Sequence, residues 1–163
     1  MSKAVEFYRR IESECPGFRA RVTSRALTRY YNAWFQPLGI TAEQFSLLVG
    51  IGGSHEPALA ELAARAGVDA TTLSRSVKSL EQSNLVRSHG GRGRAGKRLV
   101  LTDEGRRITE EAMDIWERAR IGLAEALGEE AWHEVGGAMS RLAAAAQAAT
   151  SAAESAALGD TAE

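Results

Sequence analysis

The sequence predicts a mainly α-helical fold with one small β-hairpin, and three features support this prediction. Two short helical patterns meet at a glycine within 59–80, a hairpin pattern follows at 85–102, and long helical patterns occupy both ends of the chain. The chain has 163 residues, 44% of them hydrophobic, which suits one domain with a substantial core. We therefore expect a single domain over residues 1–157 and a disordered tail at 158–163.

The first part of the chain predicts two helices, at about 3–13 and at about 18–36. The sequence Cys15-Pro16-Gly17 separates them, because proline and glycine both disfavour a helix interior. The second helix has an apolar side with helical spacing, formed by Phe18, Val22, Ala26, Tyr30 and Trp34. Pro37-Leu38-Gly39 then ends this helix.

A third helix is predicted at about 41–52. Thr41 is a suitable residue to begin it, although Glu43 lies one position short of the spacing that a capping box requires. We expect its apolar residues to face the core, namely Phe45, Leu48 and Val49.

The segment 59–80 has the most specific pattern, that of two short helices joined by a tight turn. Gly67 supplies the left-handed residue that ends the first helix, and Asp69 can accept hydrogen bonds from the free amides that begin the second. The inner face of the second helix is formed by Leu73, Val77 and Leu80. Its outer face carries Thr71, Thr72, Ser74, Arg75 and Lys78. Hydroxyl groups and cations suit phosphates and base edges, so the segment is typical of a DNA-binding helix-turn-helix.

A basic β-hairpin is predicted directly after the helix-turn-helix. Residues 85–89 and 98–102 read as strands, and the glycine-rich turn between them carries Arg92, Arg94 and Lys97. A basic hairpin beside a recognition helix is a wing, and we expect it to reach the minor groove or the phosphate backbone. The fold class is therefore a winged helix-turn-helix.

The charge distribution agrees with a DNA-binding segment, although the net charge of the chain is only −1. Residues 65–107 contain ten Lys and Arg against four Asp and Glu, whereas residues 108–163 contain three against eleven. A basic segment that coincides with a helix-turn-helix and a hairpin favours nucleic acid as the partner.

The sequence does not predict an enzyme, a cofactor or a metal site. A dinucleotide-binding pattern at 91–96 and the first part of a P-loop pattern at 91–97 lie in the hairpin turn, where an apolar strand follows instead of the helix that such motifs need. The three histidines, His55, His89 and His133, have no cysteine or histidine at metal-ligand spacing.

The last two predicted helices, at about 103–126 and 129–156, indicate an association surface. In the final helix an apolar seam follows a 3-4 spacing through Trp132, Val135, Met139, Leu142, Ala146 and Ala149. The preceding helix repeats this rhythm through Ile108, Ala112, Ile115, Ala119, Leu123 and Ala126. The seam could pack only within the monomer, but a homodimer is favoured because two-fold symmetry would place two recognition helices on one duplex. We expect a DNA-binding lobe at about 41–102 and N- and C-terminal dimerisation helices at about 3–36 and 103–156.

At this point the sequence resembles the MarR regulators (multiple antibiotic resistance regulators). The resemblance rests on four segments that occur in the family's order: Pro37–Leu48, Glu61–Asp69, Thr71–Glu81 and Leu101–Arg106. It implies a homodimeric winged-helix transcription regulator, usually a repressor. Such a regulator binds a pseudo-palindromic operator and releases it when a small ligand or an oxidant acts.

The wing departs from the family pattern. The family usually has an Asp-x-Arg there, in which the acid orients an arginine, and the corresponding positions fall near Gly93 and Ala95. This chain instead offers the cations Arg92, Arg94, Lys97 and Arg98 without an ordering carboxylate. We expect a more mobile wing that is directed mainly at phosphates.

The resemblance implies two candidate inputs for such a regulator, a small molecule and an oxidant. Family ligand pockets lie between the dimerisation helices and the DNA-binding lobe, so Trp34, Phe45 and Met113 are candidate lining residues for a small molecule, with ordinary core packing as the favoured alternative. Some relatives sense hydroperoxides through a cysteine near the start of the first long helix. Cys15 lies about two positions too early for that role, and a buried or incidental thiol is favoured.

These observations predict a ligand- or redox-responsive DNA-binding transcriptional repressor. The alternative is a helical protein-interaction module that uses a winged helix without specific DNA binding, and the basic segment favours the regulator. One cysteine, no apolar leader at the N-terminus and polar interruptions in the Ala-rich stretch 142–157 favour a cytoplasmic protein with no membrane association.

Overall fold

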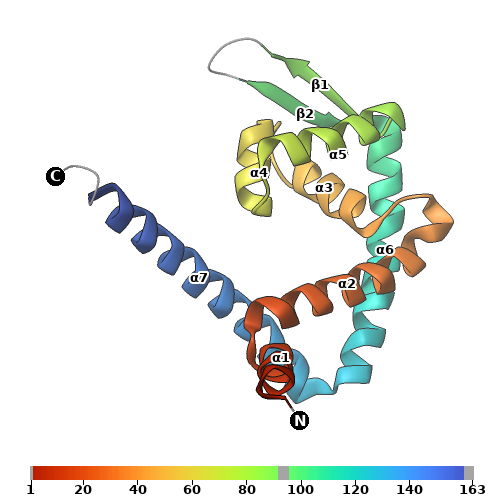
Figure 1. Cartoon of the computed structure of the whole chain (residues 1–163). Coiled ribbons are helices and arrows are strands. Elements are labelled where there is room, and N and C mark those ends of the chain that lie inside the picture. The colour runs from red at the N-terminus through yellow and green to blue at the C-terminus, as the bar shows by residue number, and fades with distance from the viewer. Residues whose placement is uncertain (1, 92–95, 160–163) are drawn as a thin grey trace. The chain divides into compact units, whose positions relative to one another are not determined.

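The computed structural model describes residues 2–91 and 96–159, and it confirms a mainly helical fold with one small sheet (Figure 1). Within these ranges two strands pair in antiparallel fashion, and the other elements are helices. In chain order the elements are α1 (Lys3–Glu14), α2 (Pro16–Phe35), a short 3-10 helix (Gln36–Leu38), α3 (Ala42–Gly52), α4 (Leu59–Ala66), α5 (Ala70–Gln82), β1 (Val86–Gly90), β2 (Lys97–Leu101), α6 (Asp103–Leu127) and α7 (Glu129–Gly159).

The chain divides into two compact units, residues 1–119 and 120–163. The first unit holds α1 to α5, the hairpin and most of α6, and it contains the core. The second holds the end of α6 and the whole of α7. In the second unit Trp132 and Val135 are half-buried, whereas Met139 and Leu142 on the predicted seam are 47% and 46% exposed in the single chain.

Side-chain caps explain where several helices begin. Thr41 Oγ1 accepts a hydrogen bond from the Gln44 amide at 3.1 Å, and Gln44 Oε1 accepts from the Thr41 amide at 2.9 Å, which is a complete capping box. Gln44, and not Glu43, has the spacing that the capping box requires, because it occupies the third position of the helix. Proline occupies the first position of α2, where its missing N–H costs nothing.

The core is formed by buried residues of α3, α4, α5, the hairpin and α6, together with Phe35 at the C-terminal end of α2. Its largest fully buried side chains are Phe35, Leu48, Ile51, Val77, Leu80 and Leu99. The expectation that Val49 faces the core is wrong: it is 43% exposed because it lies on the side of α3 that borders an open groove. Val22 is 50% exposed as well, because α2 buries only Phe35 at its C-terminal end.

The start of α6 packs closely against Asn84 and Leu85, the two residues that precede the hairpin. Thr102 Oγ1 accepts from the Gly105 amide at 2.9 Å and donates to the Asn84 carbonyl at 2.6 Å. Gly105 is buried so close to Leu85 that a Cβ atom there would lie 1.9 Å from the Leu85 carbonyl oxygen. Only glycine at position 105 allows α6 to come this close to Leu85. This close contact fixes the position of the wing relative to α6.

Among the described residues, no helix has both the length and the apolar character that crossing a membrane requires.

Candidate nucleic-acid interface

The second helix of the predicted helix-turn-helix, α5, has the two faces that the sequence indicates. Leu73, Val77 and Leu80 are 3%, 2% and 0% exposed and pack in the core. The residues predicted to bind DNA from this helix are all exposed: Thr71, Thr72, Ser74, Arg75 and Lys78. Within the described part of the chain neither Arg75 nor Lys78 forms an ion pair, so both cations are available to an anionic partner.

The turn that precedes α5 also follows the prediction. Gly67 has a φ of 65°, in the left-handed region, and ends α4. Asp69 caps α5: its Oδ1 accepts from the Thr72 amide at 2.8 Å, and its Oδ2 accepts from the Thr72 hydroxyl at 2.6 Å. The hydrogen bond from the Thr72 side chain is the main cause that lowers the pKa of Asp69 below its ordinary value, and the Thr72 amide adds to it.

A hydrogen bond between side chains connects α5 to α3, and it was not predicted from the sequence. The Ser76 hydroxyl donates to Glu43 Oε1 at 2.7 Å. At the other end of α3, the Arg65 side chain of α4 donates to the Gly50 carbonyl at 3.1 Å and to the Ser54 hydroxyl oxygen at 2.9 Å. These contacts hold both helices of the helix-turn-helix against α3, and no local sequence pattern could have shown them.

The predicted wing is present as β1 and β2, which contact α5 and α3, respectively (Figure 1). Val86 pairs with Leu101 at the base of the hairpin, and Gly90 pairs with Lys97 near the turn. Lys97 is exposed, as expected of a cation that meets DNA. Arg92 and Arg94 lie outside the described residues.

Two cations of the wing, Lys97 and Arg98, do have neighbouring carboxylates, contrary to the sequence-based expectation. Lys97 Nζ lies 3.6 Å from Glu81 Oε1 on α5, and the same carboxylate oxygen accepts a hydrogen bond from Ser88 on β1. Arg98 Nη1 donates to the Glu56 carbonyl at 3.0 Å and lies 3.8 Å from Glu61 Oε2. The expectation was wrong because these acids come from other elements, which a motif within the wing cannot reveal.

The loop before α4 is held against the base of the wing. Glu56 has a φ of 48°, a strained value for a residue with a side chain, and its carboxylate lies 3.2 Å from His89 Nε2 on β1. The Leu99 amide donates to the Pro57 carbonyl at 3.1 Å, which extends the pairing beyond the hairpin. The wing is therefore supported on two sides, by α5 and by this loop.

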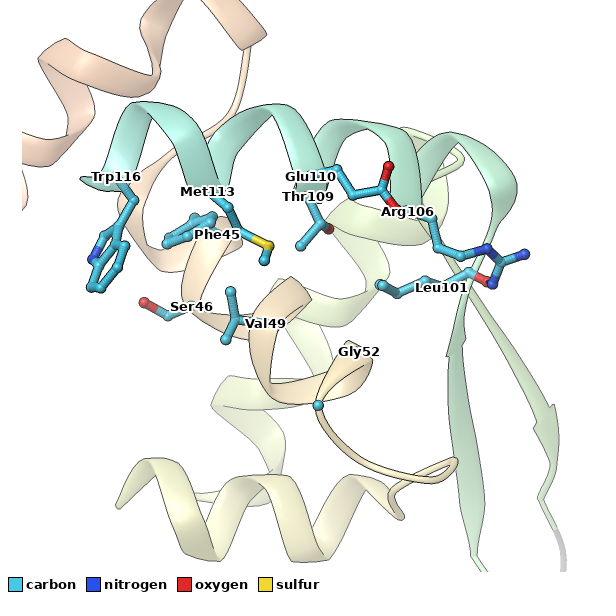
Figure 2. Close-up of a pocket in the computed structure, with 11 residues that line it drawn as sticks. Phe45, Ser46, Val49, Gly52, Leu101, Arg106, Thr109, Glu110, Met113 and Trp116 are labelled. Atoms are coloured by element: carbon cyan, nitrogen blue, oxygen red, sulfur yellow. The ribbon is translucent and has the colours of Figure 1, made fainter. Parts of the chain in front are cut away.

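A groove of about 720 Å³ opens between α3 and α6, at the edge of the core (Figure 2). Phe45 and Met113, two of the three predicted ligand-binding residues, line it. Trp34 does not line it: this residue is half-buried on α2, with its ring centroid 6.4 Å from that of Tyr30. The other lining residues were not predicted from the sequence; they are Ser46, Val49, Gly52, Gly53, Leu101, Arg106, Thr109, Glu110 and Trp116.

The groove is apolar along most of its length and charged at one end. Figure 2 shows Trp116 at one end, Phe45 and Met113 in the middle and Arg106 at the other end. Arg106 Nη1 donates to the Leu101 carbonyl at 3.0 Å, and the guanidinium also pairs with Asp103. The buried Thr109 hydroxyl donates a hydrogen bond to the Gly105 carbonyl of the same helix at 2.6 Å.

Among the described residues no group of three His, Cys, Asp or Glu side chains is placed to hold a metal ion. Cys15 is half-buried at the residue that precedes α2.

The fold and the two-faced helix define a winged helix-turn-helix, and comparisons with known proteins agree. The family model described as MarR family matches residues 38–95. The transcriptional regulator MosR from M. tuberculosis is 32% identical over 84% of this chain and 98% of its own, with a TM-score of 0.74. A structure of MosR in complex with DNA is 33% identical over 83% of this chain and 98% of its own, with a TM-score of 0.75.

A mutant of MarR from E. coli, solved in complex with operator DNA, has a TM-score of 0.72 at 21% identity over 81% of this chain and 96% of its own, which shows likeness of fold. The comparison with curated proteins gave no match. The chain belongs to the MarR family, whose members are transcriptional regulators.

Proposed function

We propose that the protein is a transcriptional regulator that binds double-stranded DNA as a homodimer, with α5 in the major groove and the wing on the adjacent backbone. The outer face of α5 carries this proposal. It presents Arg75, Lys78 and three hydroxyl groups to solvent, while the inner face of the same helix is anchored in the core. A rigid helix with exposed donors is what base reading requires. MosR, at 33% identity, has been solved in complex with DNA.

The proposed roles differ between the helix and the wing. Arg75 is the residue of α5 that is suited to a guanine edge, because a guanidinium can donate two hydrogen bonds to O6 and N7. Thr71, Thr72, Ser74 and Lys78 contact neighbouring base edges and phosphates. Arg92, Arg94 and Lys97 of the wing add sequence-independent contacts to phosphates or the minor groove.

A homodimer is supported by apolar side chains that the single chain leaves exposed at both of its ends. On α1 these are Val5, Phe7, Tyr8 and Ile11. On α7 they are Met139 and Leu142, two members of the 3-4 seam. A two-fold dimer would bury such faces and would present two copies of α5 to a pseudo-palindrome, with half-sites about one helical turn apart.

A small molecule is the proposed input, and the groove between α3 and α6 is its site. The volume of about 720 Å³ suits an effector of moderate size, and Phe45 and Met113 offer an apolar surface. Because α3 also holds α5 through the Ser76–Glu43 hydrogen bond, a ligand against α3 can shift the recognition helix. We propose that the protein represses transcription until such a ligand binds.

The test is a footprinting experiment on the DNA upstream of the protein's own coding sequence, at moderate salt. The proposal predicts protection of an imperfect palindrome with two half-sites about one turn apart. Retardation of all duplexes alike, with no protected sequence, would contradict the regulator. It would favour a winged helix that contacts protein instead.

A further inference from the structure

The hydrogen bonds at the start of α5 fix the direction in which one exposed hydroxyl group points its proton. The Thr72 hydroxyl has a single proton, and it donates this proton to Asp69 Oδ2 at 2.6 Å. The other carboxylate oxygen of Asp69 accepts from the Thr72 backbone amide at 2.8 Å. Because the hydroxyl proton already takes part in this hydrogen bond, the Thr72 oxygen can only accept a hydrogen bond from a further partner.

Asp69 cannot reverse this arrangement at neutral pH. The Thr72 hydroxyl is the main cause that lowers the pKa of the Asp69 carboxyl below its ordinary value, and the Thr72 amide lowers it further. The carboxylate therefore stays ionised, and an ionised carboxylate has no proton to donate. Thr72 must be the donor within this pair.

Thr72 also lies where a recognition helix reads bases. It is exposed in the first turn of α5, three residues before Arg75 on the same helix. The N-terminal residues of a recognition helix are the ones that contact base edges in the major groove. The side chain is short and its hydroxyl group is held by Asp69 Oδ2, so it would meet DNA in one orientation.

We propose that Asp69 is a positioning residue which makes Thr72 an obligate acceptor, so that Thr72 selects an amino group, adenine N6 or cytosine N4, at one position of each half-site. This inference rests on the proposed function, since it assumes that α5 enters the major groove. Adenine and cytosine present amino donors in that groove, whereas thymine O4 and guanine O6 are acceptors. An acceptor on Thr72 therefore attracts the first pair of bases and opposes the second.

The decisive variant is Asp69→Asn, because it reverses the hydrogen bond and keeps the cap. Asparagine is as good an N-cap as aspartate, and its Oδ1 still accepts from the Thr72 amide. Its amide nitrogen then faces the Thr72 oxygen as a donor, which frees the hydroxyl proton to point outward. We expect the preference at the Thr72 position to change from amino bases to thymine or guanine, by about 3- to 10-fold in relative affinity.

The measurement compares the full-length wild-type protein with Asp69→Asn on a set of operator duplexes in which each half-site base pair is replaced in turn, symmetrically. The readout is the pattern of base preference and not the overall affinity, because removing a negative charge near phosphates strengthens binding to all sequences alike. A purely structural role for Asp69 would change affinity or thermal stability and leave the pattern unchanged.

Thr72→Val is the matched control, because it keeps the β-branched shape and removes the hydroxyl group. We expect it to abolish the preference at the same position, and adding Asp69→Asn to it should change the pattern no further. Thr72→Ser should retain the wild-type preference.

Two results would overturn the proposal while leaving DNA recognition by α5 intact. In the first, Asp69→Asn keeps the wild-type pattern although Thr72→Val loses one preference. In the second, Thr72→Val keeps the wild-type pattern at every position. A wild-type protein without any base preference would refute the proposed function itself, and the inference with it.

Discussion

The Lys97 ammonium on the wing lies 3.6 Å from the Glu81 carboxylate at the C-terminal end of the recognition helix. Glu81 also accepts a hydrogen bond from Ser88 on the other strand of the hairpin. One acid thus connects α5 to both strands of the wing, and its negative charge lies beside a cation that we propose contacts phosphate. In a complex with DNA, Glu81 and the phosphate backbone would compete for Lys97.

The first prediction follows from this competition and concerns Glu81→Gln. Glutamine keeps an oxygen that accepts from Ser88 but removes the charge that holds Lys97. We expect tighter binding to unrelated DNA, and a salt dependence that steepens by up to about 0.9 in log affinity against log salt, the contribution of one phosphate contact. Fluorescence anisotropy with a labelled non-specific duplex across a salt series measures both quantities.

The matched control is Glu81→Gln combined with Lys97→Gln. If Lys97 is the cation that Glu81 restrains, the double variant loses the extra slope. An unchanged slope in Glu81→Gln alone would mean that Lys97 does not compete for phosphate, and that the pair only supports the hairpin.

The second prediction concerns stability, and it uses two glycines that should respond in opposite directions. Gly105→Ala forces a Cβ atom to within 1.9 Å of the Leu85 carbonyl oxygen, so α6 must move away from the hairpin. We expect a loss of about 1–3 kcal/mol or more in the free energy of unfolding, typical of overpacking. Thermal or urea unfolding followed by circular dichroism measures the change.

Gly136→Ala is the comparison, because the same methyl group in α7 would meet nothing within 4 Å. Alanine is the better helix former, so this variant should gain about 0.5–1 kcal/mol. Equal stabilities for the two variants would contradict the close approach of α6 to Leu85.

Much of the interface was predictable because it depends on local patterns. Asp69 and Gly67 lie within a few residues of the helix ends that they cap, and the spacing of Leu73, Val77 and Leu80 gives the buried face of α5 directly. Once the inner face is known, the outer face follows from the geometry of a helix.

The contacts that hold the interface in place were not predictable, because they join distant segments. Ser76 and Glu43 are 33 residues apart in the sequence, and nothing near either one indicates the other. The exposure of Val49 has the same origin, since its apolar character is compatible with either a core or the wall of a groove. The helical period shows which side of a helix a residue lies on. It does not show which other element that side packs against.

The third prediction concerns assembly and the exposed seam of α7. Leu142→Glu should destabilise the proposed dimer by at least about 2 kcal/mol, because each interface would then contain an unpaired charge. The substitution should leave the folding of the single chain intact, since Leu142 is 46% exposed there. Light scattering across a concentration series should detect monomers.

Ser140→Glu is the control for charge alone, because Ser140 is exposed on α7 but lies off the 3-4 seam. This variant should remain dimeric and bind its operator. If Leu142→Glu also remained a dimer, the seam would not be the association surface. A monomer that bound its operator as tightly as the wild type would contradict the need for two recognition helices on one frame.

The central claim is that α5 recognises a DNA sequence, and Arg75→Ala tests it most directly. The measurement compares the affinity of this variant for the protected operator with its affinity for a scrambled duplex of equal length. The account predicts a loss of about 1–3 kcal/mol for the operator and almost no loss for the scrambled duplex. Equal losses for both duplexes would make Arg75 a phosphate contact. A wild-type protein that binds both duplexes equally would contradict sequence-specific regulation by this helix.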